Sequence, residues 1–294
     1  MSSPRVLLIG RQGQVGWELC RTLAPLGGLV AVDYPEINLA DAESIRKWMR
    51  DTTPNVVVNA AAYTAVDKAE SEPALCDAIN ATAPGLLAEE SKRQGALLVH
   101  YSTDYVYDGT KQTPYTENDP PNPVSAYGRS KCAGDQAVQA VDGMFLIFRL
   151  CWVYGVRGQN FLRTIQRLAR ERETLRVVND QRGCPTWSRM IAEATALALH
   201  RVLAAADPTT YRGVYHLAAS GETSWHGFAE RIVSLMPPAE RRCRQVQAIR
   251  TAEYPTPARR PVYSVLNCDK LRDRFAIRLP DWEQSLELLS GQAG

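Results

Sequence analysis

The chain has no large excess of charge of either sign, and this narrows the classes of partner. Its 294 residues include 34 Lys and Arg against 32 Asp and Glu, which leaves a formal net charge of +2. Balanced, interspersed charges produce no broad field that would attract nucleic acid or an anionic membrane surface. We therefore expect neither nucleic acid nor a membrane as a partner.

Long hydrophobic runs and paired cysteines are also missing. The first apolar run, Val6–Ile9, is too short for a signal-peptide core or a membrane span. The seven cysteines are scattered without a Cys-x-x-Cys spacing, and the four histidines have no spacing typical of a metal site. We expect a cytoplasmic protein with reduced thiols and no catalytic metal.

The first half of the chain alternates short apolar runs with helical patterns, which is typical of a parallel sheet covered by helices. Uniformly apolar runs such as Val56–Val58 favour strands that are buried on both faces. The expected strands are Arg5–Ile9, Leu29–Val32, Val56–Asn59, Leu97–Ser102 and Met144–Leu150. The expected helices are Val15–Leu26, Ala42–Thr52, Glu72–Gln94 and Ala126–Ala140.

The second half is richer in Arg and Pro and predicts a smaller lobe. Helical patterns cover Asn160–Arg172 and Ser188–Ala205, and an apolar run at Val214–Leu217 predicts a strand that returns to the first sheet. We expect an α/β protein with a Rossmann, doubly wound parallel sheet and a smaller C-terminal α/β substrate-binding lobe. Residues 1–150 would bind NAD(P), and residues 151–294 would mainly form the lobe.

A glycine-rich turn follows the first expected strand. Gly10, Gly13 and Gly16 form a G-x-x-G-x-x-G pattern directly before a helix. Such glycines permit a tight turn and let backbone N–H groups approach a pyrophosphate at the amino end of the helix. The position of the pattern, one strand into the chain, favours a dinucleotide site over an ordinary turn.

An acidic residue stands at the end of the second expected strand. Asp33 lies about 20 residues after the glycines, where a carboxylate can bind the ribose hydroxyls of the adenosine and repel a 2′-phosphate. This favours NADH, although a turn aspartate before Pro35 is the alternative. Arg11 could accept the extra phosphate, so NADH, NADPH or both remain possible cofactors.

Tyr127 and Lys131 are four residues apart on an expected helix, so their side chains share one face. The ammonium would stabilise the phenolate and let Tyr127 exchange a proton with a carbonyl oxygen near neutral pH. Thr103 directly follows the preceding expected strand and would share the substrate oxygen with Tyr127. A surface pair is the alternative, but these residues and the glycine turn all lie at the carboxyl edge of the expected sheet.

These motifs together resemble the extended short-chain dehydrogenases. Four segments narrow the resemblance to the dTDP-4-dehydrorhamnose reductase family: Gly-Gln-Val-Gly-Trp-Glu-Leu at 13–19, Ala-Tyr-Thr-Ala-Val-Asp-Lys-Ala-Glu at 62–70, Asp-Gln-Arg-Gly-Cys-Pro-Thr at 180–186 and Ser-Val-Leu-Asn at 264–267. The similarity spans essentially the whole chain. It implies reduction of the 4-keto group of dTDP-4-dehydro-L-rhamnose to dTDP-L-rhamnose.

The resemblance also assigns residues. Tyr127, Lys131 and Thr103 would be catalytic. The cofactor would be lined by Gly10, Gly13, Gln14, Val15, Gly16, Asp33, Asn38, Leu39, Ala61, Ala62, Tyr63, Thr64, Tyr127 and Lys131. The nucleotide-sugar substrate would be contacted by Thr103, Asp104, Trp152, Asn160 and Arg182. The alternative role for Asn160 is a helix cap. The alternative role for Trp152 is packing in the core.

The resemblance leaves the roles of Asn38 and Glu18 open. Asn38 stands where members often carry Asp next to the adenine, so we expect an altered cofactor preference. Some relatives dimerise with Mg²⁺ at the interface; Glu18 could join such a site or be a solvated surface side chain, and we assign no metal. The protein is expected to be a monomer or a homodimer.

Two other functions are compatible with the same motifs. One is a reductase of a different nucleotide-linked keto-deoxysugar, because the catalytic residues set the chemistry but not the base or the hydroxyl pattern. The other is a non-catalytic NADP-binding regulatory subunit that resembles the methionine adenosyltransferase beta subunit. Retention of Thr103, Tyr127 and Lys131 favours an enzyme.

Overall fold

A six-stranded, fully parallel sheet forms the centre of the molecule. The computed structural model describes residues 3–291. The strand order is β10-β5-β4-β3-β1-β2, so the chain leaves β1 in one direction and then crosses to its other side, as in doubly wound folds. The strands are β1 Arg5–Ile9, β2 Gly28–Val32, β3 Val56–Asn59, β4 Leu97–Thr103, β5 Phe145–Leu150 and β10 Gly213–His216. The five strands predicted in the first half are confirmed to within one residue at each end.

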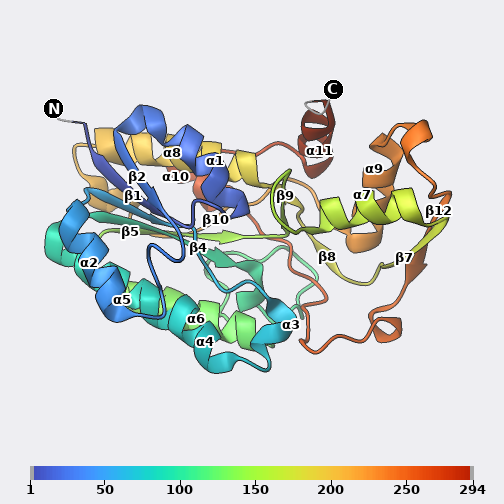
Figure 1. The fold of residues 1–294 in the computed structure, drawn as a ribbon, viewed down its shortest axis with the longest axis horizontal. Coiled ribbons are helices and arrows are strands. Elements are labelled where there is room, and N and C mark those ends of the chain that lie inside the picture. Colours follow the sequence, from blue (N-terminus) through green and yellow to red (C-terminus); the bar gives the residue numbers. More distant parts are fainter. Residues whose placement is uncertain (1–2, 292–294) are drawn as a thin grey trace.

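Helices cover both faces of the sheet, as Figure 1 shows. Successive residues of β1 alternate between the two layers: Val6 and Leu8 pack with α1 and α8, whereas Leu7 and Ile9 pack with the helices of the opposite face. This two-sided burial explains why the strands are uniformly apolar. The covering helices are α1 Gln14–Thr22, α8 Ser188–Ala204 and α10 Asp269–Phe275 on one face, and α2 Ala42–Thr52, α5 Ala83–Gln94 and α6 Ala126–Ala140 on the other.

Two predicted helices are interrupted. The predicted helix over 15–26 ends as α1 at Thr22, and a 3-10 turn follows at Ala24–Leu26. The predicted helix over 72–94 divides into α4 Pro73–Asp77, a π-helical turn at Ala78–Thr82 and α5. Pro84 has no N–H to continue the regular ladder. The carbonyl of Asn80 instead faces Gly134 of α6 so closely that a Cβ there would lie 2.1 Å from the oxygen.

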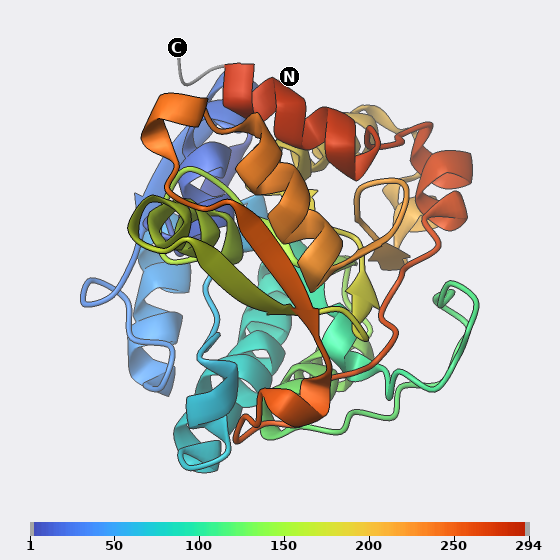
Figure 2. The ribbon, with the colours of Figure 1, turned by 90° about the vertical axis from the view of Figure 1, so that its right-hand side faces the viewer.

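The second lobe has its own core and sits beyond the carboxyl edge of the sheet. Phe228, Ile165, Val177 and Trp282 are among its buried apolar residues. Figure 2 shows the parallel pair β7 and β12 in front of α7 and α9. The lobe contains β6 Val153–Tyr154, α7 Phe161–Glu171, β7 Thr174–Val178, β8 Arg182–Gly183, β9 Thr186–Trp187, β11 Thr223–Ser224, α9 Trp225–Leu235, β12 Gln245–Ile249 and α11 Trp282–Gly291.

Three elements from the second half of the chain, α8, β10 and α10, belong to the sheet layers and not to the lobe. Helix α8 packs against α1, and β10 pairs in parallel with β5 at the edge of the sheet. The lobe is therefore connected to the sheet by several crossings of the chain. Among residues 3–291, no helix is long and apolar enough to cross a membrane.

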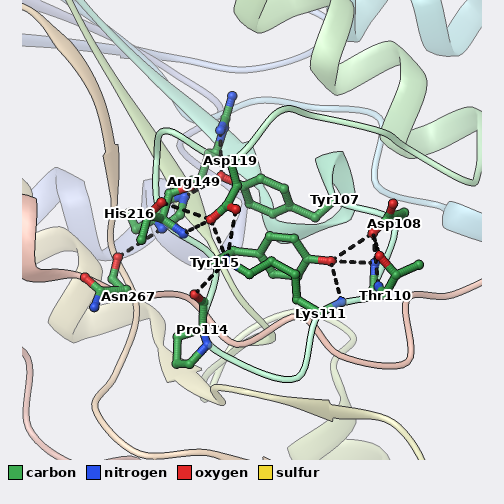
Figure 3. Close-up of polar contacts among 12 residues, drawn as sticks. Tyr107, Asp108, Thr110, Lys111, Pro114, Tyr115, Asp119, Arg149, His216 and Asn267 are labelled. Atoms are coloured by element: carbon green, nitrogen blue, oxygen red, sulfur yellow. Dashed lines mark hydrogen bonds and ion pairs between the residues drawn. The ribbon is translucent and has the colours of Figure 1, made fainter.

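A buried polar network anchors β5 and β10 to their surroundings (Figure 3). Arg149 Nε lies 3.1 Å from Asp135 Oδ2, and its Nη1 donates to the Tyr107 hydroxyl at 2.8 Å. The Tyr107 hydroxyl lies 2.7 Å from His216 Nε2. His216 Nδ1 is 3.0 Å from the carbonyl oxygen of Asn267, which can only accept, so the imidazole donates there and accepts at Nε2.

Burial and the Arg149 charge lower the pKa of His216 to about 3, so this imidazole is neutral. Arg149 is then the cation that compensates the buried Asp135 carboxylate. Both side chains are almost fully buried, at 5% and 1% exposed. A buried charge left without its partner is far more costly than an exposed one.

We expect Arg149→Met to lower the free energy of unfolding by about 3 to 5 kcal/mol, because the buried Asp135 carboxyl group would lose its hydrogen-bonded ion-pair partner. Urea denaturation followed by circular dichroism measures this change. Lys47→Met is the matched control: it breaks the exposed Lys47–Asp51 pair and should cost less than about 1 kcal/mol. An equal loss of unfolding free energy in the two variants would show that the buried pair stabilises the protein no more than the exposed pair does.

Candidate functional site

The glycine turn closes tightly between β1 and α1. Gly10 has φ +91°, a left-handed conformation, and a Cβ on it would lie 2.6 Å from the backbone nitrogen of Ala61. A Cβ on Gly16 would lie 1.9 Å from the carbonyl oxygen of Gly10. Gly13 is the N-cap of α1 and supplies no capping side chain. The first turn of α1 therefore has backbone N–H groups suited to bind an anion.

The carboxyl ends of β1, β3, β4 and β5 surround one cavity of about 620 Å³. The topological switch point between β1 and β3 lies at this edge, where doubly wound sheets bind ligands. Thirteen of the predicted site residues line the cavity: Gly10, Gly13, Gln14, Val15, Asp33, Ala61, Ala62, Thr64, Thr103, Asp104, Tyr127, Lys131 and Trp152. Trp152, Val153 and Trp225 bring the second lobe into its wall.

The other predicted cofactor residues, Gly16, Asn38, Leu39 and Tyr63, do not line the cavity. Gly16 packs against the glycine turn itself, and Leu39 belongs to the core on one face of the sheet. The Asn38 side-chain oxygen accepts from the Ala40 N–H at 3.0 Å. The Tyr63 hydroxyl donates to Glu72, while its backbone N–H donates to Asn80 Oδ1 at 2.9 Å.

Two predicted substrate residues, Asn160 and Arg182, do not line this cavity, and they are placed differently from each other. Asn160 caps α7 by accepting from the Arg163 N–H, and its Nδ2 donates to Gln14 Oε1 at 2.9 Å. It therefore contacts the cavity through Gln14. Arg182 pairs with Glu222 at 2.8 Å and lines a separate cavity of about 430 Å³. The structure does not bring Arg182 together with the catalytic candidates.

Helix α6 carries Tyr127 and Lys131 into the site. Ser125 caps the helix by accepting from the Gly128 N–H at 3.1 Å, which places Tyr127 in the first turn and Lys131 one turn later. Lys131 is 1% exposed, and its Nζ donates to the carbonyl oxygen of Tyr101 at 2.6 Å. His100 Nε2 is 3.3 Å from the same Nζ. An ammonium has three donors, so one stays available for a ligand.

Burial lowers the pKa of Lys131 to about 8, although the nearby Asp135 charge opposes the shift. Burial also lowers the pKa of His100 well below its usual value, so the imidazole beside Lys131 is neutral. Sequence reasoning did not include His100, because its position in β4 looks like that of an ordinary buried strand residue.

The proton affinity of Tyr127 differs from the prediction. We predicted that the Lys131 ammonium stabilises the phenolate. Burial instead raises the pKa of Tyr127 above its usual value, and the nearby Thr103 hydroxyl offsets this only in part. The loss of water around the phenol is the largest cause, and the nearby Asp104 and Asp135 charges raise the pKa further. Tyr127 is therefore protonated near neutral pH, the state that a proton donor needs.

Thr103 ends β4, and Asp104 begins the 3-10 turn that follows it beside Tyr127. Thr103 Oγ1 donates to Asp104 Oδ1 at 3.1 Å, and the Cys151 thiol lies 3.3 Å from Asp104 Oδ2. Asp104 is 2% exposed, and burial raises its pKa to about 6. A buried carboxyl group with a raised pKa in a cavity wall is typical of a functional site.

Asp33 directly follows β2, at the position where the adenosine of a dinucleotide would lie. Its carboxylate accepts from the backbone N–H groups of Gln12 and Tyr34, both at 2.8 Å. Arg11 Nη2 lies 3.0 Å from Glu36 Oε2, so a carboxylate already neutralises this arginine. Sequence reasoning missed Glu36, since nothing local indicated that it would face Arg11.

Glu18 is neither at the surface nor solvated. It is 2% exposed, and its Oε2 lies 3.4 Å from Arg189 Nε on α8. The expectation of a solvated Glu18 is wrong, because α8 packs over this part of α1. Within residues 3–291, no group of three or more His, Cys, Asp or Glu side chains is arranged to hold a metal ion.

This chain is similar over nearly its whole length to a known protein family and to several known proteins. Residues 4–292 match the family described as the RmlD substrate binding domain. A dTDP-4-dehydrorhamnose reductase from Burkholderia thailandensis is 49% identical over 289 residues, which cover 97% of each chain. The protein of that name from Escherichia coli K12 is 44% identical over 284 residues, which cover 95% of this chain and 94% of the relative.

A solved structure shows the same fold throughout. The crystal structure of dTDP-4-dehydrorhamnose reductase from Bacillus anthracis in complex with NADP is similar with a TM-score of 0.91 and 33% identity, covering 99% of this chain and 100% of that one. The match extends over the sheet, the glycine turn and the second lobe alike. This chain therefore belongs to the RmlD substrate binding domain family.

Proposed function

We propose that the protein reduces the 4-keto group of dTDP-4-dehydro-L-rhamnose to dTDP-L-rhamnose, with NADPH or NADH as the reductant. One observation carries the proposal: Thr103, Tyr127 and Lys131 line the same cavity as the glycine turn. The family relatives of this chain are named for this activity. The second lobe contributes Trp152 and Trp225 to the cavity wall, which supports its role as the substrate-binding lobe.

The residues present fit a dinucleotide. The bare backbone at Gly10 and Gly13 and the uncapped start of α1 suit a pyrophosphate, and Asp33 stands where the adenosine ribose would lie. Ala61 and Ala62 leave space for a flat ring close to the backbone. When bound, the reduced nicotinamide supplies the hydride for C4 of the sugar. The remaining free donor of Lys131 would bind the nicotinamide ribose.

The chain's own residues then supply the proton. Tyr127 would donate its hydroxyl proton to the C4 oxygen as that oxygen becomes an alkoxide, and its raised pKa keeps this proton in place until then. Thr103 would hold the carbonyl oxygen with its hydroxyl. The buried Lys131 ammonium would stabilise the tyrosinate that remains after the transfer. Asp104 and Trp152 would contact the sugar.

The activity is tested by oxidation of NADPH or NADH with dTDP-4-dehydro-L-rhamnose, with the product identified by mass spectrometry. We expect turnover to a dTDP-deoxyhexose, and Tyr127→Phe should lower kcat by about 10² to 10⁴ because it removes the general acid. The variant should still bind the cofactor with the wild-type Kd, since only the hydroxyl is lost.

Three results would contradict parts of this proposal. Turnover with another nucleotide-linked keto sugar alone would assign a different substrate. Cofactor binding without any turnover would favour the regulatory-subunit reading. A wild-type rate in Tyr127→Phe would exclude Tyr127 as the proton donor.

The lowered pKa of Lys131 predicts a loss of activity in alkaline solution. Reduction needs the ammonium form, which is present below a pKa of about 8 and disappears as the pH rises through that value. The pH profile of kcat/KM for the reduced cofactor, which reports the free enzyme, should therefore fall above about pH 8. Lys131→Arg should move this fall to higher pH, because a guanidinium keeps its charge. If the fall of kcat/KM at high pH is unchanged in that variant, the ionisation belongs to another group.

Cofactor preference should depend on Glu36. This carboxylate neutralises Arg11 and would repel a 2′-phosphate, so Glu36→Gln should lower the KM for NADPH roughly 3- to 10-fold and leave the KM for NADH unchanged. Steady-state kinetics with both cofactors measures the ratio. Glu43→Gln is the matched control, because it breaks an exposed pair with Arg46 on α2. An equal change for NADH in Glu36→Gln would mean that Arg11 does not read the phosphate.

A further inference from the structure

Trp152, which follows β5, has an unusual backbone conformation. Its φ is +42°, in the left-handed region that a large non-glycine residue rarely adopts. Such a conformation persists only where the surroundings hold the residue firmly. The contacts of the indole show what holds it.

One face of the Trp152 indole is covered by Trp225, the first residue of α9. The two rings are 3.5 Å apart between centroids and only 7° from parallel. A Cβ built on Gly183 would lie 2.4 Å from Trp152 Cε2, and 2.6 and 2.8 Å from Nε1 and Cζ2. These nearly equal distances place the Gly183 backbone over the plane of the ring and not beyond its edge.

Gly183 and Trp225 must cover opposite faces. A Cβ that close to one face would collide with an indole stacked on the same face at 3.5 Å, yet its three nearest atoms all belong to Trp152. Both faces of Trp152 are therefore occupied by protein. Trp152 can offer only its edge to the cavity, so it does not stack on a sugar ring.

The segment 180–186, which the sequence singled out, builds this arrangement. Gln181 is 5% exposed, and its Oε1 accepts from the Trp225 indole N–H at 3.2 Å. Gly183 leaves the space for the Trp152 ring, and the Thr186 N–H donates to the Trp152 carbonyl at 3.1 Å. From α7, Phe161 packs against Trp225 with 4.6 Å between centroids.

We propose that Gln181, Gly183 and Trp225 are positioning residues that hold Trp152 edge-on in the cavity wall, and that this fixed indole pair sets the apolar boundary for the sugar ring of the substrate. The inference rests on the proposed function for the identity of the ligand. The stacked pair acts as one rigid block, because neither ring can turn without displacing the other or the Gly183 backbone. Trp225 is then a specificity-determining residue, and no sequence motif identifies it.

Two substitutions of Trp225 test the proposal. Trp225→Leu removes the stack, so we expect the KM for dTDP-4-dehydro-L-rhamnose to rise about 10-fold while the Kd for NADPH stays at the wild-type value. Trp225→Phe keeps a ring against Trp152 and should stay within about 3-fold of the wild-type KM. Gly183→Ala pushes a methyl group into Trp152 and should raise the KM as Trp225→Leu does.

Circular dichroism reports the stack independently of activity. Two parallel indoles this close couple their electronic transitions, so the wild-type protein should show an exciton couplet in the far ultraviolet. The couplet should disappear in Trp225→Leu and in Trp225→Phe, since each leaves Trp152 without a stacked indole partner. Trp48→Phe is the control: it removes an indole of α2 that donates to the Glu36 carbonyl, and it should keep both the couplet and the KM for dTDP-4-dehydro-L-rhamnose.

The outcomes separate this inference from the proposed function. Loss of the couplet with an unchanged KM in Trp225→Leu overturns the inference, and so does a wild-type protein without a couplet. Should Trp225→Leu fail to fold, Gly183→Ala decides, because an unchanged KM in that variant also overturns it. Calorimetric titration with dTDP-L-rhamnose measures binding without turnover; a wild-type protein that neither binds it nor turns over the keto sugar rejects the proposed function instead.

Discussion

The parallel pairing of β1, β3, β4 and β5 is the constraint on which the site depends. Their register places Ile9, Asn59 and His100 side by side across three strands, and Thr103 beside Leu150. Parallel strands all end at the same edge, so the segments that follow them meet there whatever their distance in the sequence. The glycine turn follows β1, the alanines follow β3, and Thr103 closes β4. A shift of one residue in any of these strands would turn the following side chains to the opposite face.

The buried charges of α6 connect this edge to the stability of the sheet. Lys131 and Asp135 lie one turn apart on the helix face that packs against β4 and β5, and both are almost fully buried. Each lowers the electrostatic cost of burying the other, and Arg149 compensates Asp135 from the next strand. Asp135 Oδ1 still has no hydrogen-bond partner. Lys131 is therefore part of a buried charge network as well as of the proposed site.

The local parts of the fold could be predicted from the sequence. Two helices have the predicted bounds, Ala42–Thr52 and Ala126–Ala140. Asp41 and Ser125 are good N-caps that determine where these helices begin, and the apolar spacing indicates how far they extend. Tyr127 and Lys131 were found for the same reason, since both belong to one helix.

The features that were not predicted depend on contacts between distant segments. The π-helical turn arises where Asn80 meets Gly134 of another helix. The raised pKa of Tyr127 reflects how many elements exclude water from it, a quantity that no short pattern contains. The burial of Glu18 under α8 and the pairing of Arg11 with Glu36 are likewise set by the tertiary structure. Sequence patterns identify which groups can do the chemistry, and packing decides their protonation and orientation.

Trp152 shows how far packing can change the meaning of a predicted residue. An indole next to a sugar site would ordinarily be read as a flat surface for stacking, and the sequence contains nothing against that reading. The structure covers both faces, one with Trp225 and one with the Gly183 backbone, and it holds the residue at a positive φ to do so. The glycine in the segment 180–186 is thus required by an aromatic ring that lies 31 residues earlier in the sequence. Recognition in this lobe depends on the edge of a rigid aromatic block, and the residues that make the block rigid are as much a part of the site as the one that faces the ligand.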